Sequence, residues 1–573
     1  MITKSQFDLI ADLVIPDPCE LPEFDVWTHL RSLQPIAVSD PSKLCTFLHE
    51  ASLELSKYDQ FICALEGRVL EAKLKRDSLQ RHASQVSSLL SPIRRIPSEI
   101  LVRLFELAAN SDPLGGNLLG TNSEWKSQAL RISSVCYRWR TIALDTPQLW
   151  ARFALDLQPR AQQPLDLFLS RSRERKLSIT ITQIDHYYSP TPTLLRSLIA
   201  HTSRWSFIDH HYLYDDVAAS LQEIQEFPSL EYIVCPARGL DAAVFFSKQL
   251  QQCSSLKTVV LRYDRYNKFN IASLPLDNTD CLVFQYGPKG SFNDSLRVLK
   301  SCADVIGELV YQSVPEEENH GSLVREARHT SLDNDLQEQI ECKYVRKLVV
   351  NLFHRHGIYA HLRDTFQSLT LPSLVDLQLI GDCSTDGFFE ESWPSRFFDK
   401  FIVRSECTLT SLRLDLPLLD EDVIACLRHF PSLESLSVTE LSTNEENDLE
   451  PDDLVQTVTK SLMAKLTVVG ANHLKIPDKT APLLFLPKLI SLRLLVHAHF
   501  DADVEFVEMV KSRWYSFTSG SIDPSFLMHY HRLRSTVLDI QSRDAEKLVY
   551  EPLKICDSEG MRIVVKVNGA YIV

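Results

Sequence analysis

Glycine is scarce in this sequence, with 16 residues in 573, well below the ~7% of an average globular protein. The P-loop, the GxGxxG fingerprint and the GxSxG elbow need glycines at fixed positions, and none of these patterns occurs. The zinc-protease pattern HExxH is missing as well. These absences disfavour nucleotide-binding and hydrolytic enzymes, and we expect a non-catalytic protein with no cofactor and no metal site.

The thirteen cysteines contain no CxxC pair, so the sequence predicts neither a disulfide framework nor a zinc knuckle. The pattern indicates buried, reduced thiols in an intracellular protein, cytoplasmic or nuclear. Basic clusters are rare too, because the net charge is −15 and the only dense basic run is RSRERK at 171–176. We therefore expect no nucleic-acid partner.

Long apolar runs are also missing. The nearest case, residues 481–496, is interrupted by Pro487, Lys488 and Arg493, so we expect no membrane partner. The first 30 residues contain acids and prolines but no apolar core, unlike a signal peptide, and residues 1–38 form a poorly defined N-terminal segment. The length suits three or four domains or one elongated repeat array.

A heptad repeat follows this segment. Apolar residues recur at alternating steps of four and three at positions 44, 48, 51, 55, 58, 62, 65, 69, 72, 76, 79, 83, 86 and 90, and only Arg76 is not apolar. With Pro41 at the start and Pro92 at the end, the pattern predicts a long helix over 39–91. Two alternatives fit: a coiled coil that makes a homodimer through 44–90, or a helix or a hairpin broken near Gly67 that packs on its own chain.

Two short amphipathic segments come next. In the first, an apolar stripe follows Pro97 and contains Ile96, Ile100, Leu101, Leu104, Phe105 and Ala108. In the second, "LRISSVCYRWRTIALDTPQLW" (130–150), the pattern predicts one helix face that contains Ile132, Val135, Cys136, Trp139, Ile142 and Ala143. Helices this short bury little alone, so we expect them to pack on a partner or on the rest of the chain.

Together these segments resemble the F-box, in the divergent form of fungal F-box-like proteins. The resemblance rests on Ile96-Pro97, Glu99-Ile100-Leu101, Leu104-Phe105, Val135-Cys136, Trp139-Arg140 and Pro147-Leu149-Trp150. It covers residues 92–152 and implies a small all-α domain. Residues 110–126 are longer than the family's usual link between these helices, and we expect them to form an inserted surface loop.

The resemblance also implies a partner, the Skp-type adaptor of a cullin-RING ubiquitin ligase, and through the adaptor a cullin. Carried over position by position, the adaptor-binding residues are Pro97, Ile100, Leu101, Leu104, Val135, Cys136 and Trp139.

After an expected linker at 153–176, a unit recurs through residues 177–573. It is clearest in "FPSLEYIVC" at 227, "LPSLVDLQL" at 371 and "FPSLESLSV" at 430. Its apolar-x-x-apolar-x-apolar template begins near 202, 230, 256, 279, 306, 345, 374, 409, 433, 463 and 489. Most steps approach the ~20–29 residues of leucine-rich repeats. The spacing predicts a leucine-rich-repeat-like α/β solenoid with exposed insertions at 314–339 and 442–453, and an ordinary α/β domain is the alternative.

In such an array, the residues between the buried leucines line an exposed face. Those expected to bind a substrate are Asp376, Gln378, Ser411, Arg413, Ser435, Ser437, Ser491 and Arg493. This mixed polar set suits a protein target, which the sequence does not identify. The sequence therefore predicts an α/β protein that acts as an F-box substrate receptor. The alternative is a scaffold without a ligase, which associates with itself through the heptad helix.

Overall fold

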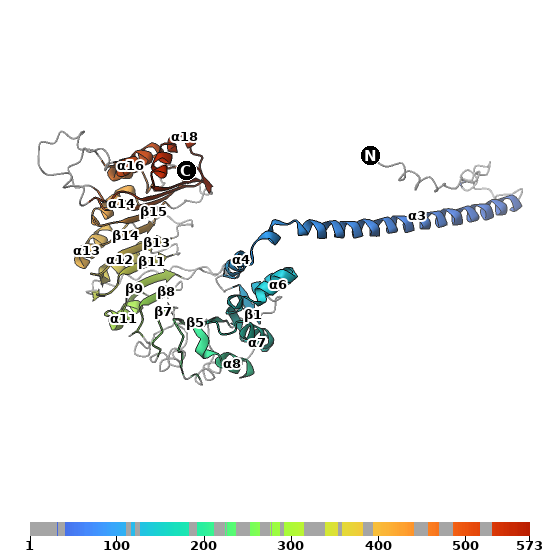
Figure 1. Ribbon diagram of the computed structural model, residues 1–573, viewed down its shortest axis with the longest axis horizontal. Coiled ribbons are helices and arrows are strands. Elements are labelled where there is room, and N and C mark those ends of the chain that lie inside the picture. The colour runs from blue at the N-terminus through green and yellow to red at the C-terminus, as the bar shows by residue number, and fades with distance from the viewer. Residues whose placement is uncertain are drawn as a thin grey trace. The chain divides into compact units, whose positions relative to one another are not determined.

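The computed structural model shows a mixed α/β protein (Figure 1). It describes residues 31, 41–110, 116–120, 126–182, 192–210, 224, 226–236, 253–263, 276, 278–286, 292–313, 339–352, 358–381, 393–440, 456–468, 485–515 and 530–573. The chain divides into two compact units, residues 1–101 and 102–573, and each unit is described by itself. Among the described residues, no helix is both long and apolar enough to cross a membrane.

The first unit consists mainly of one long helix, α3 (Pro41–Leu89), which has 49 residues (Figure 1). The helix continues through Gly67 without a break, so the hairpin alternative does not describe it. A short 3-10 helix, η1 (Pro92–Arg95), and the start of α4 (Ser98–Asn110) follow. No side chain from Leu44 to Leu89 is buried, and large apolar side chains such as Leu48, Leu55 and Leu79 are exposed.

The second unit begins with helices joined by short strands. These elements are the rest of α4, β1 (Asn117–Leu119), β2 (Lys126–Ser127), α5 (Gln128–Val135), α6 (Tyr137–Leu144) and the 3-10 helix η2 (Pro147–Trp150). Strand β1 pairs antiparallel with β2 and parallel with β3. The expectation of a surface loop over 110–126 is therefore wrong for residues 117–119, because they belong to the main sheet.

A large, mostly parallel sheet occupies the remainder, and it has 17 strands among the described residues. Its parallel strands are β3 (Arg152–Asp156), β4 (Leu177–Thr182), β5 (Trp205–His210), β6 (Tyr232–Pro236), β7 (Thr258–Tyr263), β8 (Cys281–Tyr286), β9 (Glu308–Ser313), β11 (Lys347–Leu352), β13 (Asp376–Gly381), β14 (Ser411–Asp415), β15 (Ser435–Thr439), β16 (Ser491–Val496), β17 (Ser535–Ile540) and β18 (Arg562–Val567). From β3 to β18, each of these strands pairs with the next one along the chain. Strand β19 (Ala570–Tyr571) closes the edge antiparallel to β18, and β10 (Ile340–Glu341) pairs separately with β12 (Leu369–Thr370).

The expected linker over 153–176 is also wrong. It contains β3, the 3-10 helix η3 (Pro159–Ala161) and α7 (Gln162–Arg171). Phe153, Leu155, Leu165 and Phe168 are buried, so this segment is part of the core. Alternating apolar residues in the strand and three-residue spacing in the helix are the signals that were available in the sequence.

Helices connect most strands and contact one another in chain order. They are α8 (Pro192–Ile199), α11 (Phe292–Cys302), α12 (Ile358–Ser368), α13 (Ser395–Ser405), α14 (Asp420–Leu427), α15 (Lys460–Leu466), α16 (Asp503–Tyr515), α18 (Lys547–Tyr550) and α19 (Leu553–Ser558). Contacts link α11 to α12, α12 to α13 and so on to α16, which also contacts α18 and α19. Side chains of β13, β15 and β17 alternate between buried and half-exposed. Each of these three strands therefore has one face in the core and one open face.

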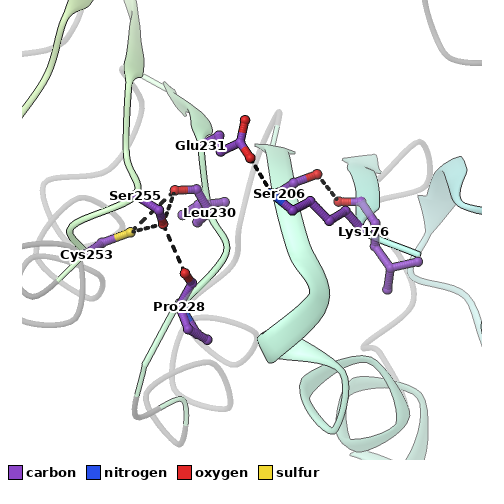
Figure 2. A network of polar contacts seen from close by, with 8 residues as sticks. Lys176, Ser206, Pro228, Leu230, Glu231, Cys253 and Ser255 are labelled. Atoms are coloured by element: carbon purple, nitrogen blue, oxygen red, sulfur yellow. Dashed lines mark hydrogen bonds and ion pairs between the residues drawn. The ribbon is translucent and has the colours of Figure 1, made fainter. Parts of the chain in front are cut away.

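The recurring Pro-Ser-Leu motif forms the turn that precedes a strand. The Leu230 amide donates to the Phe227 carbonyl, and Leu374 and Leu433 bond to Leu371 and Phe430 in the same way. Proline favours the second position of such a turn because its φ is fixed. In Figure 2, the Ser255 hydroxyl donates to the carbonyls of Pro228 (3.2 Å) and Leu230 (2.9 Å) of the preceding turn. Ser255 therefore joins two adjacent units.

A second link between units consists of backbone alone. The Glu231 amide donates to the Ser206 carbonyl (2.9 Å), and the Lys257 amide donates to the Glu231 carbonyl (2.9 Å). The same bond repeats before each following strand of the parallel series, with donors at 280, 307, 346, 375, 410, 434, 490, 534 and 562. We call this series the backbone ladder. It shows that each unit enters the sheet in the same way.

The predicted template starts can be compared with the strands. Those near 230, 256, 279, 306, 345, 374, 409, 433 and 489 lie two residues before β6–β9, β11 and β13–β16, and the start near 202 lies three before β5. The start near 463 is wrong, because it falls in α15. The expected insertions 314–339 and 442–453 lie outside the described residues, apart from Gln339, as do residues 1–38, apart from Arg31.

Candidate functional site

Helix α4 has apolar residues on two faces. Leu101, Phe105 and Ala109 follow one another at steps of four and are at most 4% exposed. Ile100, Leu104 and Leu107, at steps of four and three, are 53%, 45% and 55% exposed. Pro97, before the helix, is exposed as well. One face of α4 is therefore core, whereas the other leaves large apolar side chains in solvent.

The burial of Leu101 contradicts its assignment to the adaptor-binding surface. Its side chain is 0% exposed, whereas its neighbour Ile100 is largely open. The family motif Glu-Ile-Leu contains both residues and does not say which of them faces outward. Leu107, which the sequence analysis left out, is on the open face, and its three-residue step from Leu104 was the available signal.

The second amphipathic segment is two helices, not one, and the expectation of a continuous helix is wrong. Cys136 separates α5 from α6 with extended backbone angles (φ −159°, ψ 169°), and its Sγ accepts the amide N–H of Trp139 at 3.5 Å. Just before the break, the Ser133 and Ser134 hydroxyls donate to carbonyls three residues earlier. Such bonds compete with helical ones and favour a helix end.

The break changes which residues of this segment are exposed. Val135 is 59% exposed and Tyr137, which the sequence analysis did not select, is 84% exposed. Cys136 and Trp139 are half-buried. The Trp139 ring packs against Phe105 with 4.8 Å between centroids, so Trp139 stabilises the contact between α4 and α6.

Trp150 connects these helices to the sheet. Its side chain is 1% exposed, and its Nε1 donates to the Ala143 carbonyl of α6 at 2.8 Å. Its ring meets Phe168 of α7 edge-on at 5.1 Å. This residue therefore closes the boundary between α6 and the first strand-helix unit.

A buried asparagine, missed from the sequence, organises the same region. The Asn117 amide nitrogen donates to the carbonyls of Leu149 (3.1 Å) and Arg152 (2.9 Å). Its oxygen accepts the Ser127 hydroxyl (2.9 Å) and the Ala129 amide (3.1 Å). One side chain thus ties β1 to the start of α5 and to the start of β3.

The eight predicted substrate-binding residues lie together on the open face of the sheet. Asp376, Ser411, Ser435 and Ser491 are register partners across β13–β16, and so are Gln378, Arg413, Ser437 and Arg493. None of the eight is buried. They form two parallel polar rows across four neighbouring strands, which we call the polar rows.

The charges of the polar rows are partly paired. Arg413 forms an ion pair with Asp415 at 2.5 Å, and Gln378 donates to Asp376 at 3.0 Å. Arg493 is exposed, and no ion pair involves it within the described ranges. The polar rows therefore carry one cationic group that is available to a ligand.

In the N-terminal half of the sheet, the middle row of the same face is apolar, which the sequence analysis did not anticipate. Val234, Val260 and Val283 of β6–β8 occupy this row and are at most 8% exposed. Phe207 and Tyr232 stack beside them at 4.8 Å. Burial raises the pKa of Tyr232 to about 12, in keeping with apolar surroundings. This half has polar residues as well, because Arg262 pairs with Asp209 at 3.3 Å and Lys347 pairs with Glu308 at 2.6 Å.

The cysteines of the described ranges are all free thiols, but not all are buried as expected. Cys45 and Cys63 of α3 are exposed, and Cys136, Cys281 and Cys407 are half-buried. Burial raises the pKa of the Cys235, Cys302 and Cys342 thiols to about 12. Thiols with such values are inert at neutral pH, so none of these three is a candidate nucleophile.

Comparison with protein families matches the F-box-like family at residues 93–156. Comparison with curated proteins gives no match. The matched residues include most of η1, all of α4–α6 and η2, and the first strand of the parallel series. The chain therefore contains an F-box-like domain at residues 93–156, followed by a large parallel sheet.

Proposed function

We propose that the protein is a substrate receptor that docks a Skp-type adaptor, and through it the cullin of a cullin-RING ubiquitin ligase. The observation that carries this proposal is the F-box-like match at 93–156. F-box domains in general bind adaptors of this type, and the F-box-like domain here has apolar side chains available for such a contact.

The docking residues that we propose are the exposed apolar ones. On α4 they are Ile100, Leu104 and Leu107, and at the break between α5 and α6 they are Val135 and Tyr137. Covering an exposed aliphatic side chain contributes about 1–2 kcal/mol of association free energy when it becomes fully buried. A few such anchors carry most of the energy in a typical interface.

We further propose that the parallel sheet is a leucine-rich-repeat-like solenoid that holds a protein target. The chain-order strand pairing and the backbone ladder support this, because every strand of the series pairs only with the strands of adjacent units. The polar rows are then the target-binding surface. The receptor itself performs no chemistry, since partner subunits transfer ubiquitin and the receptor raises the target's effective concentration near them.

The test is co-expression of the full chain with a Skp-type adaptor and affinity purification. The variant Ile100→Asp, Leu104→Asp places two charges on the open face of α4 without altering its buried face. We expect the wild type to retain the adaptor and this variant to lose it, with binding at least about 30-fold weaker.

The matched control is Leu419→Asp, Val504→Asp. These leucine and valine side chains are 52% and 54% exposed, close to the values for Ile100 and Leu104. Both lie at the start of helices, α14 and α16, where aspartate is favourable. The control should bind like the wild type. Failure of the wild type to retain any adaptor would refute the receptor proposal, and equal binding by both variants would refute the choice of residues.

A second function is a scaffold that assembles with itself and belongs to no ligase. The apolar seam of α3 favours it, because large aliphatic side chains of that seam, such as Leu48, Leu55 and Leu79, are exposed. The same purification separates the two functions, since a scaffold would purify without the adaptor, whatever its own oligomeric state.

A further inference from the structure

The seam of α3 is defined by the fourteen heptad positions from Leu44 to Leu90, and none of its members is buried. Seven of its aliphatic members are 51–71% exposed, namely Leu48, Leu55, Ile62, Val69, Leu79, Val86 and Leu90, whereas Leu44, Ala51, Tyr58 and Leu65 are half-buried. A helix of this kind gains most of its stability from packing an apolar face. The exposed aliphatic side chains of the seam are therefore available to a partner.

The period of the seam identifies the kind of surface that fits it. Alternating steps of four and three average 3.5 residues, which keeps the stripe on one side of two helices that supercoil around each other. A stripe that packs on a sheet or a globular core repeats every 3.6 residues instead. Within two or three heptads, such a stripe no longer coincides with the heptad positions. This one persists for almost seven heptads over 49 helical residues. The fitting partner is another long helix with the same period.

The charges of α3 are distributed unevenly along it. Residues 41–66 contain four acidic and two basic side chains, and residues 67–90 contain five basic and two acidic ones. The residues that flank the seam follow this division. Glu54, Asp59 and Glu66 lie in the first half, and Arg68, Lys73 and Lys75 lie in the second. The helix thus has an acidic half and a basic half.

This division disfavours a parallel pair of identical helices. The heptad positions are lettered a to g, and the seam consists of positions a and d. In a parallel coiled coil, the residue that precedes each position a lies next to the residue five positions later in the partner helix. Glu54 would then face Asp59 of the second copy, Arg68 would face Lys73, and Arg76 would meet its own copy inside the seam. Like charges in these places repel, so a parallel pair carries repulsion on both edges and in its core.

An antiparallel pair reverses each of these contacts, because the acidic half of one helix lies on the basic half of the other. With the two-fold axis beside Gly67, the whole seam overlaps, Leu55 lies opposite Leu79, and Arg76 lies opposite Tyr58 of the second copy. Only the flanking residues nearest the axis, Glu66 and Arg68, approach their own copies.

We propose that α3 binds the α3 of a second copy of this chain as an antiparallel two-stranded coiled coil, centred at Gly67. This goes beyond adaptor docking, and the chain could dimerise with or without a ligase. Exposed charge pairs contribute little affinity individually. The apolar seam therefore provides most of the free energy of dimerisation, and the charges determine whether the two helices are parallel or antiparallel.

The first experiment measures the mass of the full-length chain by light scattering after gel filtration at micromolar concentrations. We expect a dimer whose dissociation constant rises at least about 100-fold in Leu55→Glu, Leu79→Glu, because four glutamates enter the seam. The matched control, Leu53→Glu, Leu74→Glu, changes two leucines that lie on α3 outside the seam and are 53% and 62% exposed.

The control should remain a dimer. Circular dichroism of both variants shows whether the helix persists, which separates lost pairing from lost folding. A wild type that stays monomeric overturns the proposal and leaves the seam to another segment or protein. A control that dissociates as readily as the seam variant overturns it too.

The second experiment determines orientation by disulfide cross-linking in a Cys45→Ser, Cys63→Ser background, which removes the exposed thiols of α3. Leu48→Cys and Val86→Cys lie opposite each other in the antiparallel register. Two copies of Leu48→Cys would be about 55 Å apart in that register. We expect a mixture of the two variants to form a covalent heterodimer, and each variant alone to stay at the level of the background protein. Cross-linking of Leu48→Cys alone would show a parallel pair and overturn the assignment.

Discussion

At the scale of single residues, buried polar side chains tie neighbouring elements of the second unit together. Arg513 is an extreme case in the second unit, because it is 1% exposed and donates to the carbonyls of Leu466, Phe485 and Leu486. Burial lowers its pKa, but its three carbonyl partners satisfy the guanidinium. Asn117 has the corresponding role near β3, since it satisfies two backbone carbonyls and accepts two bonds.

We expect Asn117→Ala to destabilise the region around it by about 2–4 kcal/mol, because the Leu149 and Arg152 carbonyls lose a buried donor. Amide hydrogen exchange of residues 126–156 should then speed up by ~30-fold or more. The control is Asn351→Ala, which truncates a half-buried asparagine on the open face of β11 and should cost under about 1 kcal/mol. Equal effects of the two substitutions would contradict the role assigned to Asn117.

At the scale of elements, the sequence predicts periodic features well. The Pro-Ser-Leu motif marks strand starts because proline and serine suit the turn and leucine fills the core. The template near 463 failed because Met463 and Leu466, three residues apart, also fit a helix turn, and that is what the chain forms in α15. Short apolar patterns do not distinguish the two periods.

Features that depend on contacts between distant residues could not be predicted from sequence patterns. The break at Cys136 contains neither proline nor glycine, and the strand at Asn117 has three residues. The break depends on the packing of Trp139 against Phe105, and β1 depends on its pairing with β3. Phe105 and β3 are far from these features in the sequence. For the same reason, the sequence indicated that α4 is apolar but not that Leu101 faces inward and Ile100 outward.

The long helix offers a prediction of its own at Gly67. Nothing lies within 4 Å of a Cβ added there, and glycine costs a helix interior about 0.5–1 kcal/mol relative to alanine. Gly67→Ala should therefore slow amide exchange of residues 60–75 about three-fold. Gly560→Ala is the contrasting substitution, because Gly560 has a φ of +100° and alanine there should destabilise the turn before β18. Faster exchange in Gly67→Ala would contradict an unbroken helix.

At the scale of the whole second unit, stability is expected to depend on neighbours. Leu436 of β15 is 1% exposed and lies between β14 and β16. Leu436→Ala should cost about 2–4 kcal/mol. If the units contact only adjacent units, exchange should rise mainly in β14, β15 and β16, while β4 and β5 keep wild-type protection.

The control is Ser437→Ala in the same strand, on the open face, which should leave exchange unchanged. A uniform rise over all strands in Leu436→Ala would instead indicate that the second unit unfolds as one cooperative domain, and it would argue against a solenoid.

The backbone ladder has a consequence for how this protein can change over time. The ladder bonds join main-chain atoms, and the buried leucines fix the core, so neither depends on the identities of residues on the open face. Gln378, Arg413, Ser437 and Arg493 can therefore be replaced without altering strand order or register. Single substitutions on the open face can therefore change which molecule it binds during evolution, while the fold that carries this face stays the same.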